Sequence, residues 1–231
     1  MSKNCIVSFA SNGRNDYRKW LLNLLDSCVE HWGGDYLIYS PDHWLNNYKG
    51  IEIKNVTPTN VNYFPFYEHS EMPYQFKIAI IEQARQMGYE KIIWLDTSLR
   101  LLKNPIHLFK EKGVTVFHNL GHPLYKYISD DAVEKLGITE SALMGIQQIW
   151  CGLLFFDFTH NNAVDVFNKI KEFSINGSFK DGISKRDGFV AHRHDQAVMS
   201  VLVSGKCDML PYGVVAAKND ITEETYIQYG N

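Results

Sequence analysis

Residues 88–96 read Gly88-Tyr-Glu-Lys-Ile-Ile-Trp-Leu-Asp96 and contain the clearest strand in the chain. The run from Lys91 to Leu95 is apolar almost throughout, which is typical of a strand buried on both faces of a parallel sheet. Gly88 separates this strand from an amphipathic pattern over residues 73–87, which predicts a helix that begins after Pro73. The segment is therefore expected to form a helix, a turn and a buried strand that ends on Asp96.

Further helix and strand patterns alternate along the chain on both sides of this segment. The patterns predict strands at residues 5–10, 35–39, 51–56, 113–118, 151–158 and 207–210, and further helices at residues 16–32, 162–173 and 194–203. Strands that alternate with helices predict a mostly parallel twisted sheet with helices on both faces, in which ligands bind at the carboxyl ends of the strands. We expect one Rossmann-like α/β domain spanning residues 1–231, because this length is compatible with one packed core.

Composition narrows the class of protein. The chain has 231 residues, 45% of them hydrophobic and 21% charged, which excludes disordered and coiled-coil classes. With a net charge of -3, the chain does not have the positive electrostatic field that a non-specific nucleic-acid binder normally needs. The chain begins without a signal-peptide pattern and contains no apolar run of membrane-spanning length, so we expect a soluble cytoplasmic protein.

The four cysteines are widely spaced and form no C-x-x-C pair, which predicts reduced thiols rather than disulfides or a zinc knuckle: Cys5, Cys28, Cys151 and Cys207.

Two charged residues are expected at the ligand-binding edge. Asp96 follows the most buried strand, so its carboxylate is expected at the ligand-binding edge, where it could contact a metal or a phosphate. The alternative is a structural role, because aspartate also forms turns at such positions. Lys77 lies near the start of the preceding helix, where its charge and the helix dipole both favour an anion, although a solvated surface lysine fits the same pattern. Together they predict an anion-binding site.

The helix from Tyr74, the strand that ends in Asp96-Thr97-Ser98 and the following Leu102-Lys-Asn-Pro105 resemble the GT-A glycosyltransferases. In that family the strand delivers an Asp-x-Asp motif that holds a divalent metal on the diphosphate of a nucleotide sugar. The resemblance implies a nucleotide-sugar donor such as a UDP-sugar, a Mn²⁺ or Mg²⁺ ion at Asp96, and donor binding by Lys77, Asp96 and Ser98. Here Ser98 replaces the second carboxylate, and no histidine follows His194 to serve as the family's late metal ligand.

Two later segments extend the resemblance to about two-thirds of the chain. Trp150-Cys-Gly152 resembles the small-residue strand start that lines the acceptor side of the family's cleft, which implies acceptor binding by Trp150, Cys151 and Gly152. A glycine that merely opens a strand is the alternative. His194-Asp195-Gln196 resembles the Asp-Gln helix start at the family's reaction centre. The resemblance implies that Asp195 is the catalytic base of an inverting enzyme and that His194 and Gln196 contact the acceptor, whereas a plain helix N-cap is the alternative for Asp195. Two histidines at i and i+2, with no cysteine nearby, do not predict a zinc site.

The N-terminal strand matches the family's position for the base and ribose, which implies that Ser8, Ala10 and Asn12 bind the donor. By the same resemblance, residues 1–105 form a nucleotide-binding half and residues 106–231 an acceptor-side half. The chain has no G-x-G-x-x-G, P-loop or G-x-S-x-G motif, which disfavours dinucleotide oxidoreductases, P-loop enzymes and α/β-hydrolases.

Several alternatives stay open at this point. A sugar-phosphate nucleotidyltransferase is expected to begin with a glycine-rich loop and basic residues, which Ser11-Asn-Gly-Arg14 matches only in part. A non-catalytic nucleotide-sugar or carbohydrate binding module fits the incomplete acidic motif. We favour a hexosyl- or pentosyltransferase acting on a glycan or small hydroxyl acceptor, because the net charge is negative. The basic loop with Lys180, Lys185 and Arg186 leaves a modified nucleic acid open as the acceptor.

Overall fold

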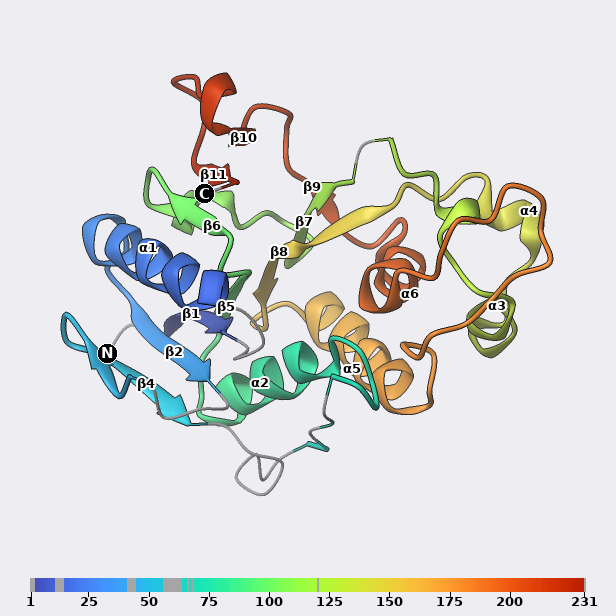
Figure 1. Ribbon diagram of the computed structural model, residues 1–231, viewed down its shortest axis with the longest axis horizontal. Coiled ribbons are helices and arrows are strands. Elements are labelled where there is room, and N and C mark those ends of the chain that lie inside the picture. Colours follow the sequence, from blue (N-terminus) through green and yellow to red (C-terminus); the bar gives the residue numbers. More distant parts are fainter. Residues whose placement is uncertain are drawn as a thin grey trace.

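The computed structural model describes residues 3–10, 15–40, 45–55, 64–65, 67, 69–119 and 121–230 (Figure 1). Its helices and strands alternate along most of the chain. The main sheet contains β1 (Asn4–Phe9), β2 (Asp35–Ser40), β3 (Asn47–Tyr48), β4 (Ile51–Asn55), β5 (Lys91–Leu95), β7 (Val114–His118), β8 (Ile149–Asp157) and β9 (Asp208–Met209). The α-helices are α1 (Asn15–His31), α2 (Gln75–Gln86), α3 (Asp130–Leu136), α4 (Glu140–Leu143), α5 (Asn161–Ile175) and α6 (His194–Val203).

Over the described ranges, the main sheet has eight strands in the order β3-β4-β2-β1-β5-β8-β7-β9. Strands β4, β2, β1 and β5 are parallel neighbours, and β9 is parallel to β7. Strand β8 lies antiparallel between β5 and β7. Its first residues therefore lie at the same edge of the sheet as the carboxyl ends of β5 and β7. The predicted mostly parallel sheet is confirmed.

Helices cover both faces of this sheet, as predicted. Alternate residues of the buried strands point to opposite faces, as Ile92 and Ile93 of β5 do. Helix α1 packs on one face through Leu24 and Cys28. Helices α2, α5 and α6 pack on the other face, where Ile80 and Val198 belong to one continuous core. Figure 1 shows α1 on one side of the sheet and α2 and α5 on the other.

The start of β8 departs from regular pairing. Val116 of β7 pairs with Leu154, but the next residue, Phe117, pairs with Trp150. The residues between Trp150 and Leu154 therefore bulge out of the ladder with β7. Bulges re-aim the backbone and are frequent beside active sites. This one occurs at the edge where β5 ends.

A second, smaller sheet was not predicted from the sequence patterns. It consists of β6 (Leu99–Leu101), β10 (Val215–Ala217) and β11 (Ile227–Tyr229), in the order β10-β11-β6. Strand β11 pairs antiparallel with β6, so that Tyr229 lies opposite Leu99. The C-terminal segment is thereby held next to the residues that follow Asp96.

The two short helices α3 and α4 and the four cysteines have distinct local environments. Ser129 caps α3, since its hydroxyl accepts a hydrogen bond from the Ala132 amide at 3.3 Å. Thr139 precedes α4 but makes no side-chain cap. All four cysteines are free thiols, and Cys207 is the one that is not fully buried. Within the described residues, no helix is both long and apolar enough to cross a membrane.

Candidate functional site

Helix α2 places Lys77 at the edge where β5 ends. Its N-cap, Tyr74, has a left-handed backbone with φ of 61°, which is uncommon for a residue other than glycine. Lys77 is the third residue of the helix, and its side chain is only 3% exposed. The predicted position at a helix start is confirmed, but the lysine is buried rather than solvated.

Helix α6 brings Asp195 to the same point. The helix begins at His194 with Arg193 as its N-cap, so Asp195 is the second helical residue and the N-cap alternative is wrong. His194 also has a positive φ, 39°, and its Nδ1 bonds the Phe179 carbonyl oxygen at 3.0 Å. Since that oxygen can only accept, Nδ1 carries the proton. Strained residues of this kind concentrate at functional sites, and here two of them begin the two converging helices.

The ammonium group of Lys77 lies between two carboxylates. Its Nζ is 2.9 Å from Asp195 Oδ2 and 3.6 Å from Asp96 Oδ1. It also donates a hydrogen bond of 2.9 Å to the Cys151 carbonyl oxygen, which the bulge of β8 presents. The Asp195 contact has ion-pair distance, but hydrogen-bond geometry is not satisfied at Oδ2. The three charged residues come from α2, α6 and the end of β5, and form one cluster in which Lys77 and Asp195 are buried and Asp96 is partly exposed.

The charges in this cluster perturb one another. Burial alone would lower the pKa of Lys77, but the carboxylates of Asp195 and Asp96 outweigh burial and raise it. The amine is therefore charged at neutral pH. Burial raises the pKa of Asp195, and the nearby Lys77 ammonium opposes that effect. With both aspartates ionised, the cluster carries one net negative charge.

Aromatic and polar side chains hold the cluster in place. The Lys77 ammonium lies 5.2 Å from the ring centroid of Tyr74 and 5.4 Å from that of Trp94, at cation–π distance. The Trp94 indole donates a hydrogen bond of 2.8 Å to Asp96 Oδ1, which fixes that carboxylate. The Tyr74 ring also contacts the His194 ring at 5.6 Å. Tyr74 and Trp94 were not among the predicted site residues, although both flank the motifs that were.

The other residues predicted to bind the donor lie outside the charged cluster or outside the described ranges. Ser8 is fully buried, and its hydroxyl donates a hydrogen bond of 2.6 Å to the Leu95 carbonyl oxygen, so it joins β1 to β5. Ala10 is also buried, at the end of β1. Ser98 is half-buried, two residues after Asp96. Asn12 lies outside the described residues. A donor role for these four residues stays a prediction.

Cys151 and Trp150, two of the residues predicted to bind the acceptor, point to opposite faces of β8. The Cys151 thiol is buried against Met199, so this residue offers the site its carbonyl group. The Trp150 side chain packs against the core on the opposite face of the sheet, which α1 covers. Gly152 is required locally, since a Cβ atom there would lie 2.7 Å from the Trp150 indole, and its carbonyl accepts from the Asp96 amide. Gln196 is 9% exposed, and its Nε2 has no hydrogen-bond partner among the described residues.

The oxygen atoms at Asp96 can be compared with the needs of a divalent cation. Oδ1 is occupied by Trp94 and Lys77, but the side chain is 36% exposed. Among the described residues, no group of three or more His, Cys, Asp or Glu side chains could hold a metal. One accessible carboxylate, with Ser98 nearby, fits Mg²⁺ or Mn²⁺ only if donor phosphates and water complete the coordination, which is a common arrangement for Mg²⁺.

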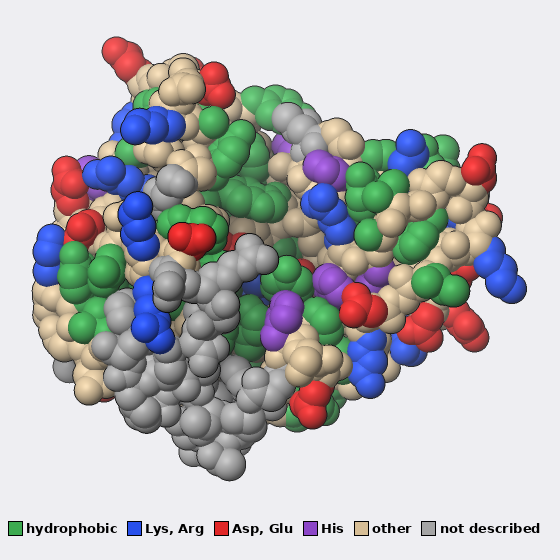
Figure 2. Space-filling model, in the orientation of Figure 1, with side chains coloured by type: hydrophobic (Ala, Val, Ile, Leu, Met, Phe, Trp, Pro, Cys, Tyr) green, Lys and Arg blue, Asp and Glu red, His purple; other side chains and the backbone are tan. Residues whose placement is uncertain are grey.

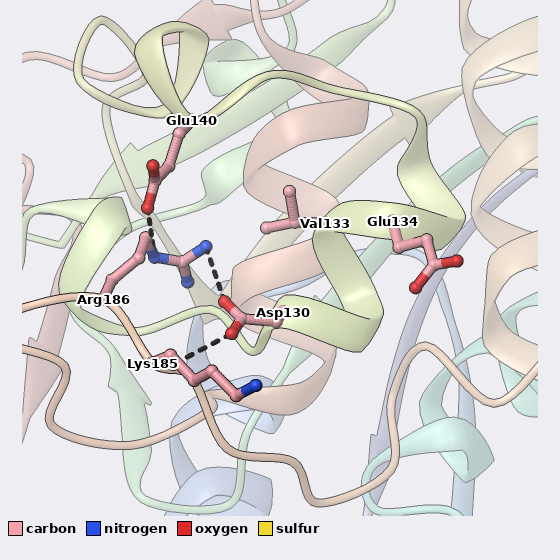
Figure 3. Close-up of a pocket in the computed structure, with 6 residues that line it drawn as sticks. All are labelled: Asp130, Val133, Glu134, Glu140, Lys185 and Arg186. Atoms are coloured by element: carbon pink, nitrogen blue, oxygen red, sulfur yellow. Dashed lines mark hydrogen bonds and ion pairs between the residues drawn. The ribbon is translucent and has the colours of Figure 1, made fainter.

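A surface hollow of about 420 Å³ lies elsewhere, between α3, α4 and the loop after α5 (Figure 3). Arg186 crosses it and pairs with Asp130 at 3.2 Å and Glu140 at 3.7 Å. The Lys185 backbone amide also donates a hydrogen bond to Asp130, so these contacts anchor the basic loop that carries Lys185 and Arg186. The lining charges of this open hollow are explained by the contacts that hold the loop, so we take the Lys77 cluster at the carboxyl edge of the sheet as the candidate functional site.

Comparison with known proteins supports the fold. No protein-family model matches the chain, and no curated protein sequence is significantly similar to it. The crystal structure of the galactosyltransferase LgtC in complex with donor and acceptor sugar analogues aligns with 97% of this chain and 86% of that one, with a TM-score of 0.55 and 13% identity. The apo structure of the bifunctional glycosyltransferase WbbM aligns with 99% of this chain, which spans 45% of WbbM, with a TM-score of 0.61 and 10% identity. The chain has the α/β fold of GT-A glycosyltransferases, as predicted.

Proposed function

We propose that this protein is a glycosyltransferase that moves a hexosyl or pentosyl group from a nucleoside diphosphate sugar to a hydroxyl acceptor. The observation that carries the proposal is the buried Lys77 ammonium held between Asp96 and Asp195 at the carboxyl edge of a GT-A sheet. Ligands of open α/β sheets bind at this edge. A buried, paired charge cluster of this kind is also a recognised indicator of a functional site.

The donor diphosphate is proposed to lie beside Lys77 and Asp96. The lysine ammonium is permanently charged and only 3% exposed, so its field is weakly screened. The start of α2 adds the positive end of a helix dipole. The lysine and the helix dipole offset part of the negative charge of Asp96 and Asp195 beside a leaving group whose own negative charge grows as the sugar departs. Residues 1–105 would then supply most donor contacts and residues 106–231 most acceptor contacts.

The proposed reaction forms one bond and breaks one bond at the anomeric carbon. The acceptor oxygen attacks that carbon, and the bond from the carbon to the β-phosphate oxygen breaks. The electron pair of the broken bond leaves with the nucleoside diphosphate. The hydroxyl proton passes to a base in the inverting form of the reaction, and its ultimate acceptor is solvent. Stereochemical inversion and retention are both compatible with the cluster.

Asp195 is the proposed base or orienting group. Its side chain is 5% exposed, and burial raises its pKa, which moves a carboxylate toward the range useful for proton transfer. Lys77 holds Oδ2 at 2.9 Å and so restricts where the carboxylate points. We propose that His194 and Gln196, on either side of Asp195, contact the acceptor.

A divalent cation is proposed to assist donor binding modestly. When bound, it would neutralise phosphate charge as a Lewis acid. Asp96 would hold it, with Ser98 as a weaker oxygen ligand. Because the protein supplies only one accessible carboxylate, we expect the cation to contribute only part of the donor affinity, beside the positive charge of Lys77.

Turnover of nucleotide sugars tests the proposal. The wild-type protein is incubated with a panel of UDP-, GDP- and TDP-sugars, with and without Mn²⁺, and release of nucleoside diphosphate is measured. We expect release from at least one donor, and loss of that release in Asp195→Ala. Asp157→Asn is the matched control, because Asp157 is equally buried and ion-paired, 3.2 Å from Lys91, but lies at the other end of β8. Donor binding without turnover in the presence of acceptors would instead indicate a binding module.

A further inference from the structure

Five aromatic side chains lie in contact at the edge where β8 begins. We call them the aromatic strip: Phe117, His118, Trp150, Tyr212 and Tyr229. Neighbouring ring centroids in the strip are 5.1 to 6.4 Å apart. The strip joins β7 and β8 to β11 and to the segment after β9, which are far apart in the sequence.

The aromatic strip is open to solvent although its strands are otherwise buried. Tyr212 is 57% exposed and Tyr229 is 45% exposed, while the three middle rings are half-buried. The Tyr212 ring stacks on His118 with an interplanar angle of 22°, so an exposed ring is held in a fixed orientation. Figure 2 shows hydrophobic side chains gathered in the recess between the C-terminal segment and the lobe that carries α3 and α4.

The strip begins next to the charged cluster. Tyr229 pairs with Leu99, three residues after Asp96. Trp150 precedes Cys151, whose carbonyl binds Lys77, and packs over Gly152, whose carbonyl binds the Asp96 amide. Phe117 and Trp150 of the strip lie on the face of the sheet opposite Lys77, but the strip and Lys77 reach the same edge of the sheet. A ligand on the strip can therefore extend over that edge toward Asp96.

Three buried polar atoms at this edge have no hydrogen-bond partner among the residues that the structure describes. Gln148 is fully buried, and its Oε1 accepts a hydrogen bond of 2.8 Å from Asn119, whereas its Nε2 has no partner within the described ranges. His118 Nδ1 and Gln196 Nε2 are likewise without a described partner. Ser200 links the backbone near Gln148 to that of Gln196. Its hydroxyl donates a hydrogen bond to the Gln196 backbone carbonyl and accepts one from the backbone amide of Ile149, the residue after Gln148. Unpaired buried polar groups are unfavourable, so a ligand that supplies hydroxyl groups is favoured here.

We propose that the aromatic strip, with the unpaired amide of Gln148, is the acceptor subsite and that it selects a neutral carbohydrate. This proposal rests on the proposed function. Flat apolar rings suit the C–H face of a pyranose, and amide and imidazole nitrogens suit its hydroxyls. A nucleic-acid acceptor would require cations beside the stacking rings. In the part of the chain that the structure describes, a lysine or arginine lies over other rings, such as Tyr127 and Tyr226, and over none in the strip.

Saturation-transfer NMR tests the proposal. The protein, with UDP present, is mixed with maltose, lactose or cellobiose, and separately with a single-stranded DNA oligonucleotide. We expect saturation transfer to at least one disaccharide from the wild-type protein, and weakening of that binding by about tenfold in Tyr212→Ala and Tyr229→Ala, since each loses a large apolar ring. Tyr48→Ala is the control, because Tyr48 is a partly exposed tyrosine on β3 at the other end of the sheet.

Donor binding is measured by calorimetry in the same samples, which separates this proposal from the proposed function. If the wild-type protein binds a nucleotide sugar but no disaccharide, or binds the oligonucleotide instead, the acceptor proposal is overturned and the proposed function survives. Equal weakening by Tyr48→Ala would also overturn it. Failure of every nucleotide sugar to bind the folded wild-type protein would overturn both.

Discussion

Removal of the Lys77 charge should destabilise the protein strongly. The Lys77→Met variant keeps the apolar stem but leaves Asp195, with its side chain 5% exposed, without the cation 2.9 Å away. Breaking a buried ion pair by removing one partner typically costs about 3–5 kcal/mol. For a chain of this length, that loss corresponds to a decrease in melting temperature of about 6–20 °C. Asp96 contributes less to this effect because it is 36% exposed.

The sign of the pH dependence follows from Asp195. Burial already raises its pKa, and loss of Lys77 should raise it further. A carboxyl whose folded-state pKa lies above its unfolded value destabilises the fold at neutral pH, and that penalty decreases as pH falls through the folded pKa toward about 3.9. The deficit of Lys77→Met relative to wild type should therefore be smaller at pH 5 than at pH 7.5.

Urea denaturation at both pH values measures these effects. The double variant Lys77→Met/Asp195→Asn should recover most of the lost stability, because both buried charges are then absent. Lys171→Met is the matched control, since Lys171 pairs with buried Glu82 at 2.8 Å but lies on α5, away from the site. If the double variant is no more stable than Lys77→Met at pH 7.5, the ion-pair interpretation is refuted.

Three further results are expected. Asp195→Asn should slow turnover by about a hundredfold or more at a temperature where it remains folded, and unchanged turnover in a folded sample would exclude a catalytic role. EDTA should weaken donor binding only modestly in calorimetry, because Asp96 is the one accessible carboxylate in the cluster, and complete loss of binding would reveal further metal ligands. Burial lowers the pKa of His192 from 6.5 to about 4, so stability should fall as pH decreases from about 6.5 to 4. Loss of stability over that interval should be smaller in His192→Asn, and an identical pH profile in the two proteins would count against this assignment.

The sheet and its helices were predictable because their signals are local. The run from Ile92 to Leu95 is apolar throughout, and Pro73 and Gly88 mark the two ends of the helix that precedes it. Strands β6, β10 and β11 carry no such signal, because each has only three residues and β6 pairs with a segment near the end of the chain. The bulge in β8 was equally invisible, since it depends on how Phe117 pairs across the sheet.

The candidate site was predictable as separate residues but not as a cluster. Lys77, Asp96 and Asp195 each stand at the end of a predicted element, which suggested one edge of the sheet. Their pairing depends on side-chain direction and on how α2 and α6 begin, and Tyr74 and His194 at these two helix starts have positive φ angles that no local sequence pattern predicted. No local pattern distinguishes a lysine that is 3% exposed from a solvated lysine at the same helical position.

The central claim is that a nucleotide sugar binds at the cluster formed by Lys77, Asp96 and Asp195. A thermal-shift screen of nucleotide sugars, with and without Mn²⁺, tests it most directly, because a ligand that binds the native state raises the melting temperature by mass action. At about 100 times its dissociation constant, a donor should stabilise the protein by about 2.7 kcal/mol, or about 5–11 °C. We predict such a shift for at least one nucleotide sugar. No shift with any of them, in a protein shown to be folded, would contradict the claim.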